Sequence, residues 1–373
     1  MNKGIMAHFS QLQDPRIERK KLHDLQDILT LVICGIIGGA TGWKSIIEFA
    51  HEKESWYRQF IPLKNGIPSV DCISYVISRL SFKGFRECFI SWTASVAEET
   101  SGQIISIDGK TARGSRDKKK DQSPLHMVSA WANSSQIVLA QEVTNKKSNE
   151  ITAIPKLLDL LNLKECIVTI DAMGCQKEIA QKIIEKDGDY VFSLKGNQGT
   201  LHDSVTEFFD IAEQDNYANL NYKEKETIDK GHGRLEKRRY IICDNLETIA
   251  NKDDWKGFKS IGMAERICYD GQVEKKEVRY FISSINVNAE LFSKSVREHW
   301  GIENKLHWRL DVVFNEDNSR IRKGNAPEIM TTIRHLCMGI FDNDKTINNL
   351  AEKKRKACWS DSYRAKLMFG KSF

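Results

Sequence analysis

Two aspartates, far apart in the chain, stand where their carboxylates could share one site. Asp108 follows the apolar run Ile104–Ile107, and Asp171 follows the apolar run Cys166–Ile170. Both runs predict buried strands, and a side chain at a strand end can project into a cleft from a rigid base. A single Asp there is usually a turn former or a helix cap. Two such residues on one predicted sheet favour a shared site.

A third acid, Glu303, interrupts an apolar helical stripe. The stripe proceeds in steps of three and four residues, and its apolar members are Phe292, Val296, Trp300, Leu306, Leu310 and Phe314. Glu303 takes a place where the periodicity asks for an apolar side chain, and a buried carboxylate is costly unless it is paired or bound to metal. The alternative is a salt bridge to Arg297, Lys305 or Arg309. Because those neighbours point largely off the stripe, we favour metal binding.

Three converging carboxylates would make an oxygen-rich site suited to Mg²⁺ or Mn²⁺. Two such ions, roughly 3.5–4 Å apart, can activate a water or a 3′-hydroxyl and stabilise the leaving oxygen of an in-line phosphoryl transfer. A zinc site at His299, Glu303 and His307 is disfavoured, since the H-E-x-x-H order and a thiolate pair are both absent from the sequence. A phosphate loop is excluded, because Ile104 stands where that motif needs glycine.

Basic, amide and aromatic side chains lie where a DNA backbone could run. Lys195 and its neighbours follow the apolar run Tyr190–Leu194, a good place to hold phosphate near the metals. The lysines at 118–120 are more typical of a solvated surface. Trp300 is either a core residue or stacks on a displaced base. The candidate DNA-binding residues are Lys110, Arg113, Lys195, Asn197, Gln198, His299 and Trp300.

The elements that must position these residues change in kind along the chain. Residues 1–98 predict a helical N-terminal domain, which either reads DNA or serves as a packing module. Residues 99–345 predict a catalytic domain with the order β-β-β-α-β-α-β, an α/β fold with a mixed sheet and flanking helices, as in ribonuclease-H-like (retroviral-integrase-like) proteins. We expect a β-rich insertion at about 200–285, with turns at 231–233 and 270–271. Residues 346–373 predict a basic C-terminal tail.

Composition agrees with a folded, DNA-compatible protein. The 373 residues predict two or three domains, and 40% hydrophobic residues can form a sizeable core. A net charge of +5 permits nucleic-acid binding without demanding it. Nine scattered cysteines favour reduced thiols in the cytoplasm. No signal peptide is recognisable, and no apolar run reaches the roughly 20 residues that a bilayer needs.

Several long strings together resemble one protein family. They are LHDLQDILTLVICGIIGGATGW, IDGKTARGS, KSNEITAIPKLLDLL, TIDAMGCQKEIA, DYVFSLKGNQG and REHWGIENKLHWRLDVVFNED. These strings are similar to the H-repeat-associated proteins, insertion-sequence transposases linked to Rhs elements, and the resemblance covers essentially the whole chain. It implies a ribonuclease-H-like domain of the Asp-Asp-Glu (DDE) type. By motif, the acids are Asp108 in IDGKT, Asp171 in TIDAMG and Glu303 in HWGIEN.

The resemblance also implies an activity and partners. It implies Mg²⁺- or Mn²⁺-dependent cutting of double-stranded DNA at terminal inverted repeats, strand transfer to target DNA, a homodimer on DNA and a nucleoid-associated location in the cytoplasm. The broader group has Tyr, Arg and Lys at fixed offsets from the Glu, where this chain has Val296, His299 and Leu310. Glu316 and Asp317 are weaker candidates for the third ligand. A metal-dependent nuclease without strand transfer and an inactive or domesticated DNA-binding relic remain alternatives.

Overall fold

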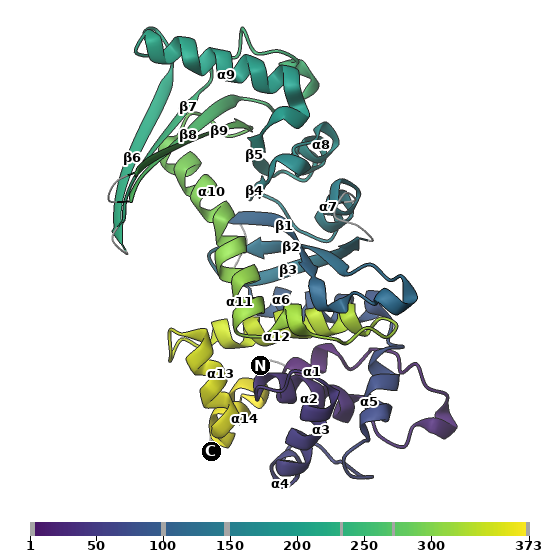
Figure 1. The fold of residues 1–373 in the computed structure, drawn as a ribbon. Coiled ribbons are helices and arrows are strands. Elements are labelled where there is room, and N and C mark those ends of the chain that lie inside the picture. Colours follow the sequence, from purple (N-terminus) through teal and green to yellow (C-terminus); the bar gives the residue numbers. More distant parts are fainter. Residues whose placement is uncertain (1–3, 98–101, 145–149, 232–233, 271–272, 371–373) are drawn as a thin grey trace.

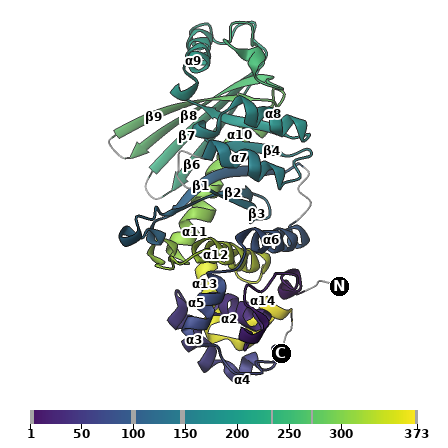
Figure 2. The same cartoon turned by 90° about the vertical axis from the view of Figure 1, so that its right-hand side faces the viewer.

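The computed structural model describes residues 4–97, 102–144, 150–231, 234–270 and 273–370. One large sheet with its helices occupies one end of the molecule, and a helical bundle that holds both ends of the chain occupies the other (Figures 1 and 2). The predicted boundary at residues 98 and 99, and parts of the two predicted turns at 231–233 and 270–271, lie outside the described residues. No helix in the described ranges has the length and apolar character needed to cross a membrane.

The described residues form one nine-stranded sheet in the order β3-β2-β1-β4-β5-β9-β8-β7-β6. The strands β1, β4 and β5 run parallel to one another, and every other neighbouring pair is antiparallel. Their bounds are β1 (Ile104–Ala112), β2 (Leu125–Ala132), β3 (Ile137–Thr144), β4 (Ile167–Ile170), β5 (Asp189–Leu194), β6 (Tyr222–Gly231), β7 (Arg234–Cys243), β8 (Ser260–Asp270) and β9 (Val273–Ser283). The fold is therefore a mixed α/β arrangement.

The segment predicted as a β-rich insertion extends the same sheet. It begins with the helix α9 (Gly199–Gln214) and continues with β6 to β9, of which β9 pairs with β5 from Val191 to Leu194. The first five strands thus provide a rigid base, and the four long strands widen the sheet beyond it (Figure 1).

Helices cover the two faces of the sheet unequally. The helices α7 (Glu150–Asp159), α8 (Lys177–Glu185) and α9 pack their apolar sides on one face. On the other face lies α10 (Ala289–Gly301), which packs through Phe292 and Val296. Strand side chains alternate between the faces, so every second residue of a strand faces α10.

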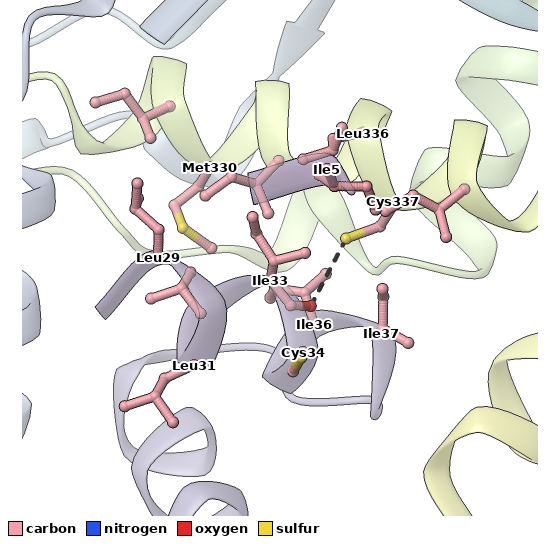
Figure 3. Close-up of a cluster of buried hydrophobic side chains, with 14 of the residues drawn as sticks. Ile5, Leu29, Leu31, Ile33, Cys34, Ile36, Ile37, Met330, Leu336 and Cys337 are labelled. Carbon is pink, nitrogen blue, oxygen red and sulfur yellow. Dashed lines mark hydrogen bonds between the residues drawn. The ribbon is translucent and has the colours of Figure 1, made fainter. Parts of the chain in front are cut away.

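The helical end of the molecule is built from both ends of the sequence. Its core combines residues from Ile5 to Trp92 with residues from Ala326 to Met368. Figure 3 shows the contact between α2 and α12, where Cys337 lies 3.9 Å from the carbonyl oxygen of Ile33. The helices are α1 (Ile5–His8), α2 (Leu25–Ile37), α3 (Trp43–Glu52), α4 (Glu54–Tyr57), α5 (Val70–Ile77), α6 (Phe82–Val96), α12 (Ala326–Asn343), α13 (Leu350–Trp359) and α14 (Asp361–Phe369).

The segment expected as a basic tail is folded as α13 and α14. Lys353 is buried and donates to the carbonyl oxygens of Phe341 and Asp344. Arg364 is fully buried, and its guanidinium lies 4.3 Å from the ring centroid of Trp56. The sequence predicted only a basic tail, but long basic side chains can bury their stems and hydrogen-bond carbonyl oxygens.

Candidate active site

The parallel pairing of β1 and β4 brings the two aspartates side by side. In the ladder, Ile107 is opposite Ile170, so Asp108 and Asp171 are the next residues on two adjacent strands. Both point to the face that carries α10, because Ile104 and Ile167, an even number of residues earlier, pack in the same cluster as α10. Asp171 directly follows β4, as the sequence predicts. The prediction that Asp108 lies at a strand end is wrong: it is the fifth of the nine residues of β1, because β1 continues past the end of β4 and stays paired with β2.

Asp171 also caps the turn that follows its strand. Its Oδ1 accepts hydrogen bonds from the backbone N–H groups of Met173 at 3.1 Å and Gly174 at 3.3 Å. The capping interpretation of a strand-end Asp is thus correct for one oxygen. A carboxylate has about four lone-pair sites, so the cap leaves acceptor capacity on Asp171.

Glu303 lies on the helix that crosses the same face. After α10 the helix widens into a π-helical segment, η8 (Ile302–His307), and continues as α11 (Trp308–Val312). Glu303 is exposed, whereas Ile302 and Leu306 are buried. The prediction that Glu303 occupies the apolar stripe is therefore wrong. The buried face of the helix includes Ile302, one residue earlier. Turns of π-helix are frequent at functional sites.

Polar contacts hold α10 close to the strands of the two aspartates. Ser106 of β1 donates to the carbonyl oxygen of Glu298 at 3.2 Å, and Thr169 of β4 lies 3.1 Å from Nδ1 of His299. Gly301 allows the close approach, since a Cβ there would lie 2.6 Å from Oδ1 of Asn133. The helix is thereby placed over β1 and β4.

The electrostatics of Asp108 show that other acids are near. Burial and then the charges of Asp171, Glu150 and Glu303 raise the pKa of Asp108 to about 7, against a hydrogen bond from the N–H of Gly109 that lowers it. Burial holds the pKa of His307, whose Nδ1 is 3.5 Å from Asp108, at about 3. His307 is therefore neutral and does not neutralise the aspartate.

Asp108 is affected by the charges of Asp171 and Glu303, but the three acids do not form a closed cage. Within the described ranges, no three His, Cys, Asp or Glu side chains are gathered closely enough to hold a metal ion as they stand. The donor set of Asp108, Asp171 and Glu303 is made of oxygen alone, which fits Mg²⁺ or Mn²⁺. A cation would also relieve the repulsion that raises the pKa of Asp108.

The two basic residues after Asp108 are paired with carboxylates. Nζ of Lys110 lies 2.7 Å from Asp311, 3.2 Å from Glu316 and 3.4 Å from Asp317. The guanidinium of Arg113 is largely exposed and lies 3.5 Å from Asp317. Glu316 and Asp317 are thus paired with cationic side chains, which disfavours them as the third metal ligand.

The candidates after β5 lie beside the loop of the second acid. Asn197 donates to the carbonyl oxygen of Ala172 at 2.7 Å, and Gln198 donates to that of Cys175 at 2.9 Å. Their amides therefore tie the two loops together. Lys195 is exposed at the end of β5, the strand next to β4.

A groove opens between the helix, from Val296 to Asn304, and the strands β7 to β9. It has a volume of about 270 Å³. Trp300 and Asn304 line it from the helix, and Arg238 and Arg279 line it from the sheet. The Arg279 guanidinium lies 4.3 Å from the ring centroid of Trp300. Trp300 is thus a partly exposed groove residue and not a core residue.

Sequence reasoning missed a buried polar chain behind Asp108. Thr111 Oγ1 is 2.7 Å from Nδ1 of His126, whose Nε2 is 2.6 Å from Glu150. A Cβ on Gly109 would lie 2.5 Å from Glu150, so the glycine lets this pair approach the strand. Glu150 begins a helix, where an acid is ordinary, and its sequence position carried no further signal.

The chain belongs to the family described as Transposase DDE domain, which it matches over residues 99–340. Residues 6–93 match a second family, described as DDE_Tnp_1-associated. The chain is 42% identical over 374 residues to the H repeat-associated putative transposase YhhI of Escherichia coli K12, covering 99% of this chain and 98% of that one.

Two further relatives show how widely the similarity extends. A putative transposase, YncI, of Escherichia coli O157:H7 is 42% identical over 95% of this chain and 91% of its own. An uncharacterized protein in the dhlA 3′ region of Xanthobacter autotrophicus is 40% identical over 74% of this chain and 92% of its own. The resemblance to H-repeat-associated transposases that the sequence motifs indicate is thereby confirmed.

Proposed function

We propose that this protein is a DDE transposase that cuts double-stranded DNA at the terminal inverted repeats of an insertion sequence and transfers the 3′ ends to target DNA. Asp108, Asp171 and Glu303 would hold Mg²⁺ or Mn²⁺, two ions in all. The observation that carries this proposal is the parallel register of β1 and β4, which aligns two acids beneath the helix that bears the third. The order β3-β2-β1-β4-β5 supports a ribonuclease-H-like core.

Different residues of the chain would bind the metal and the DNA. Metal held by the three carboxylates supplies activation of the attacking oxygen and stabilisation of the leaving oxygen. Lys195, at the end of the strand next to Asp171, would bind a backbone phosphate, and Arg113 extends the same basic edge. Trp300, which lines the groove between the helix and the sheet, would stack on a displaced base. His299 is neutral, because burial lowers its pKa to about 4, and can donate a hydrogen bond without repelling cations.

The assembly and location follow from this activity. Two ends of one element must be cut together, so we propose a homodimer on DNA located at the nucleoid in the cytoplasm. The groove and the two aspartates lie on the face that carries α10, and DNA would approach there.

A cleavage assay with the DNA that flanks the gene tests the proposal. Asp108→Asn, Asp171→Asn and Glu303→Gln should each reduce Mg²⁺-dependent cleavage to the level without metal while DNA binding persists. Glu298→Gln is the matched control on the same helix, because Glu298 pairs with Lys294 instead. An acid variant that cleaves at the wild-type rate contradicts the assignment of that residue.

The same assay separates the alternatives. Cleavage without joining to a target duplex indicates a nuclease without strand transfer. Metal-independent DNA binding without cleavage by the wild-type protein indicates an inactive relic. Joining of cleaved 3′ ends to target DNA indicates the transposase.

A further inference from the structure

Lys110 connects the strand of the first acid to the helix of the third. It follows Asp108 by two residues on β1, so both side chains leave the strand on the same face. Its ammonium lies 2.7 Å from Asp311, which belongs to α11. Because α10, η8 and α11 form one continuous helical segment, this contact joins the strand of Asp108 to the helix of Glu303.

The Lys110 ammonium is also paired with a second, buried carboxylate. Glu316, 3.2 Å from the Lys110 ammonium, has 1% of its side chain exposed and lies 3.3 Å from Arg334 of α12. Burial opposes ionisation of Glu316, but Arg334 and Lys110 together hold its pKa below the usual value. Lys110 therefore faces an ionised carboxylate that cannot turn toward solvent.

The loops around this cluster are also closely packed. Asp317 accepts a hydrogen bond from the backbone N–H of Arg113 at 3.1 Å. A Cβ on Gly114 would lie 2.5 Å from the carbonyl oxygen of Ser319, so the loop after β1 touches the loop after α11 directly.

We propose that Lys110 is a positioning residue that sets the placement of Glu303 relative to Asp108, and that it does not bind DNA phosphate. An ammonium has three N–H donors, and three carboxylates already surround this one. The inference rests on the proposed metal site, and it replaces the assignment of Lys110 to DNA binding.

The affinity for Mn²⁺, measured by electron paramagnetic resonance on the full chain without DNA, tests the role. Removing a positive charge near a cation site would by itself tighten Mn²⁺ binding. Loss of positioning has the opposite sign, and outer partners of metal ligands typically contribute about 10–100-fold in affinity. We therefore expect Lys110→Met to weaken Mn²⁺ binding by about 10–100-fold.

Arg309→Met is the matched structural control. Arg309 pairs with Asp342 of α12, its side chain is 12% exposed like that of Lys110, and it lies on the same helix as Asp311. This variant should lose comparable thermal stability and keep its Mn²⁺ affinity within about twofold. Equal weakening in both variants would overturn the proposal, since it would show a general effect of unpinning the helix.

If Lys110→Met does not fold, two less disruptive variants test the same positioning role. Asp311→Asn and Asp317→Asn each remove one negative charge near the same ammonium, but only Asp311 lies on the helix of Glu303. Asp311→Asn should weaken Mn²⁺ binding more than Asp317→Asn does. Equal affinities in this pair would overturn the positioning role.

DNA binding distinguishes the two roles of Lys110. A positioning residue leaves the metal-free DNA affinity and its salt slope unchanged, whereas a phosphate contact would reduce the slope by about 0.9. A wild-type protein that binds no Mn²⁺ overturns the proposed function and this inference with it. If the wild type binds Mn²⁺ and Lys110→Met binds it equally well, only the positioning role is overturned.

Discussion

The strands that carry Asp108 and Asp171 and the helix that carries Glu303 are fixed by different forces. Backbone hydrogen bonds of a parallel ladder align the two aspartates. The helix is fixed without a backbone ladder, through apolar contacts of Phe292 and Ile302, a hydrogen bond from Ser106 to the carbonyl oxygen of Glu298, and the ion pair of Lys110 with Asp311. We therefore expect the two aspartates to be more rigidly placed than Glu303.

The largest loss of stability is expected when the buried carboxylate that pairs with Lys110 and Arg334 is removed. Glu316→Ala leaves Arg334 and Lys110 without their buried partner, and breaking a buried ion pair costs about 3–5 kcal/mol. Urea unfolding measures this loss. Lys182→Met, which breaks an exposed pair with Asp159, should cost no more than about 1 kcal/mol. Similar losses of unfolding free energy in the two variants would contradict the distinction between the buried and the exposed ion pair.

A smaller effect is expected where the helix touches the sheet. Gly301→Ala places a Cβ 2.6 Å from Oδ1 of Asn133, and overpacking of this kind costs about 1–3 kcal/mol. Gly199→Ala, where nothing lies within 4 Å of the added Cβ, is the control and should cost nothing. If thermal unfolding gave the same midpoint for both variants, the close contact between the helix and Asn133 would be contradicted.

The strands of the site were predictable from sequence. The apolar runs before Asp108 and Asp171 identified two strands, because a run of buried residues is a local property, whereas the pairing of these strands as neighbours came only from the structure. The line of burial on the helix of Glu303 was misjudged, since Trp300 faces a groove and Ile302 faces inward, a choice that only tertiary packing makes. The pairing of Lys110 with Asp311 and Glu316 joins residues about 200 positions apart, which no local pattern reveals.

The raised pKa of Asp108 predicts a dependence of stability on pH. In the unfolded chain this group ionises near its ordinary value of 3.8, and in the folded protein at about 7. Its contribution to stability is therefore present below the lower value and is lost as pH rises through about 7. Asp108→Asn should raise the unfolding temperature at about pH 8 by about 2–4 °C, and by less at about pH 5. If calorimetry shows that the difference in unfolding temperature between Asp108→Asn and the wild type does not grow with pH, the raised pKa of the Asp108 carboxyl is contradicted.

The smallest effect concerns the exposed basic edge of the sheet. Lys195→Ala should weaken DNA binding only several-fold and reduce the slope of log affinity against log salt by about 0.9, as one lost phosphate contact predicts. Fluorescence anisotropy over a range of salt concentrations measures both. Lys182→Ala, on α8, is a control that should leave the slope unchanged. An unchanged slope for Lys195→Ala would remove this residue from the DNA path.

The most direct test of the account is Mn²⁺ binding by the wild-type protein and its three acid variants. We predict that Asp108→Asn, Asp171→Asn and Glu303→Gln each weaken binding strongly, whereas Glu298→Gln binds as the wild type does. Loss of affinity in the two aspartate variants but wild-type affinity in Glu303→Gln would contradict the claim that strands and helix contribute to one metal site.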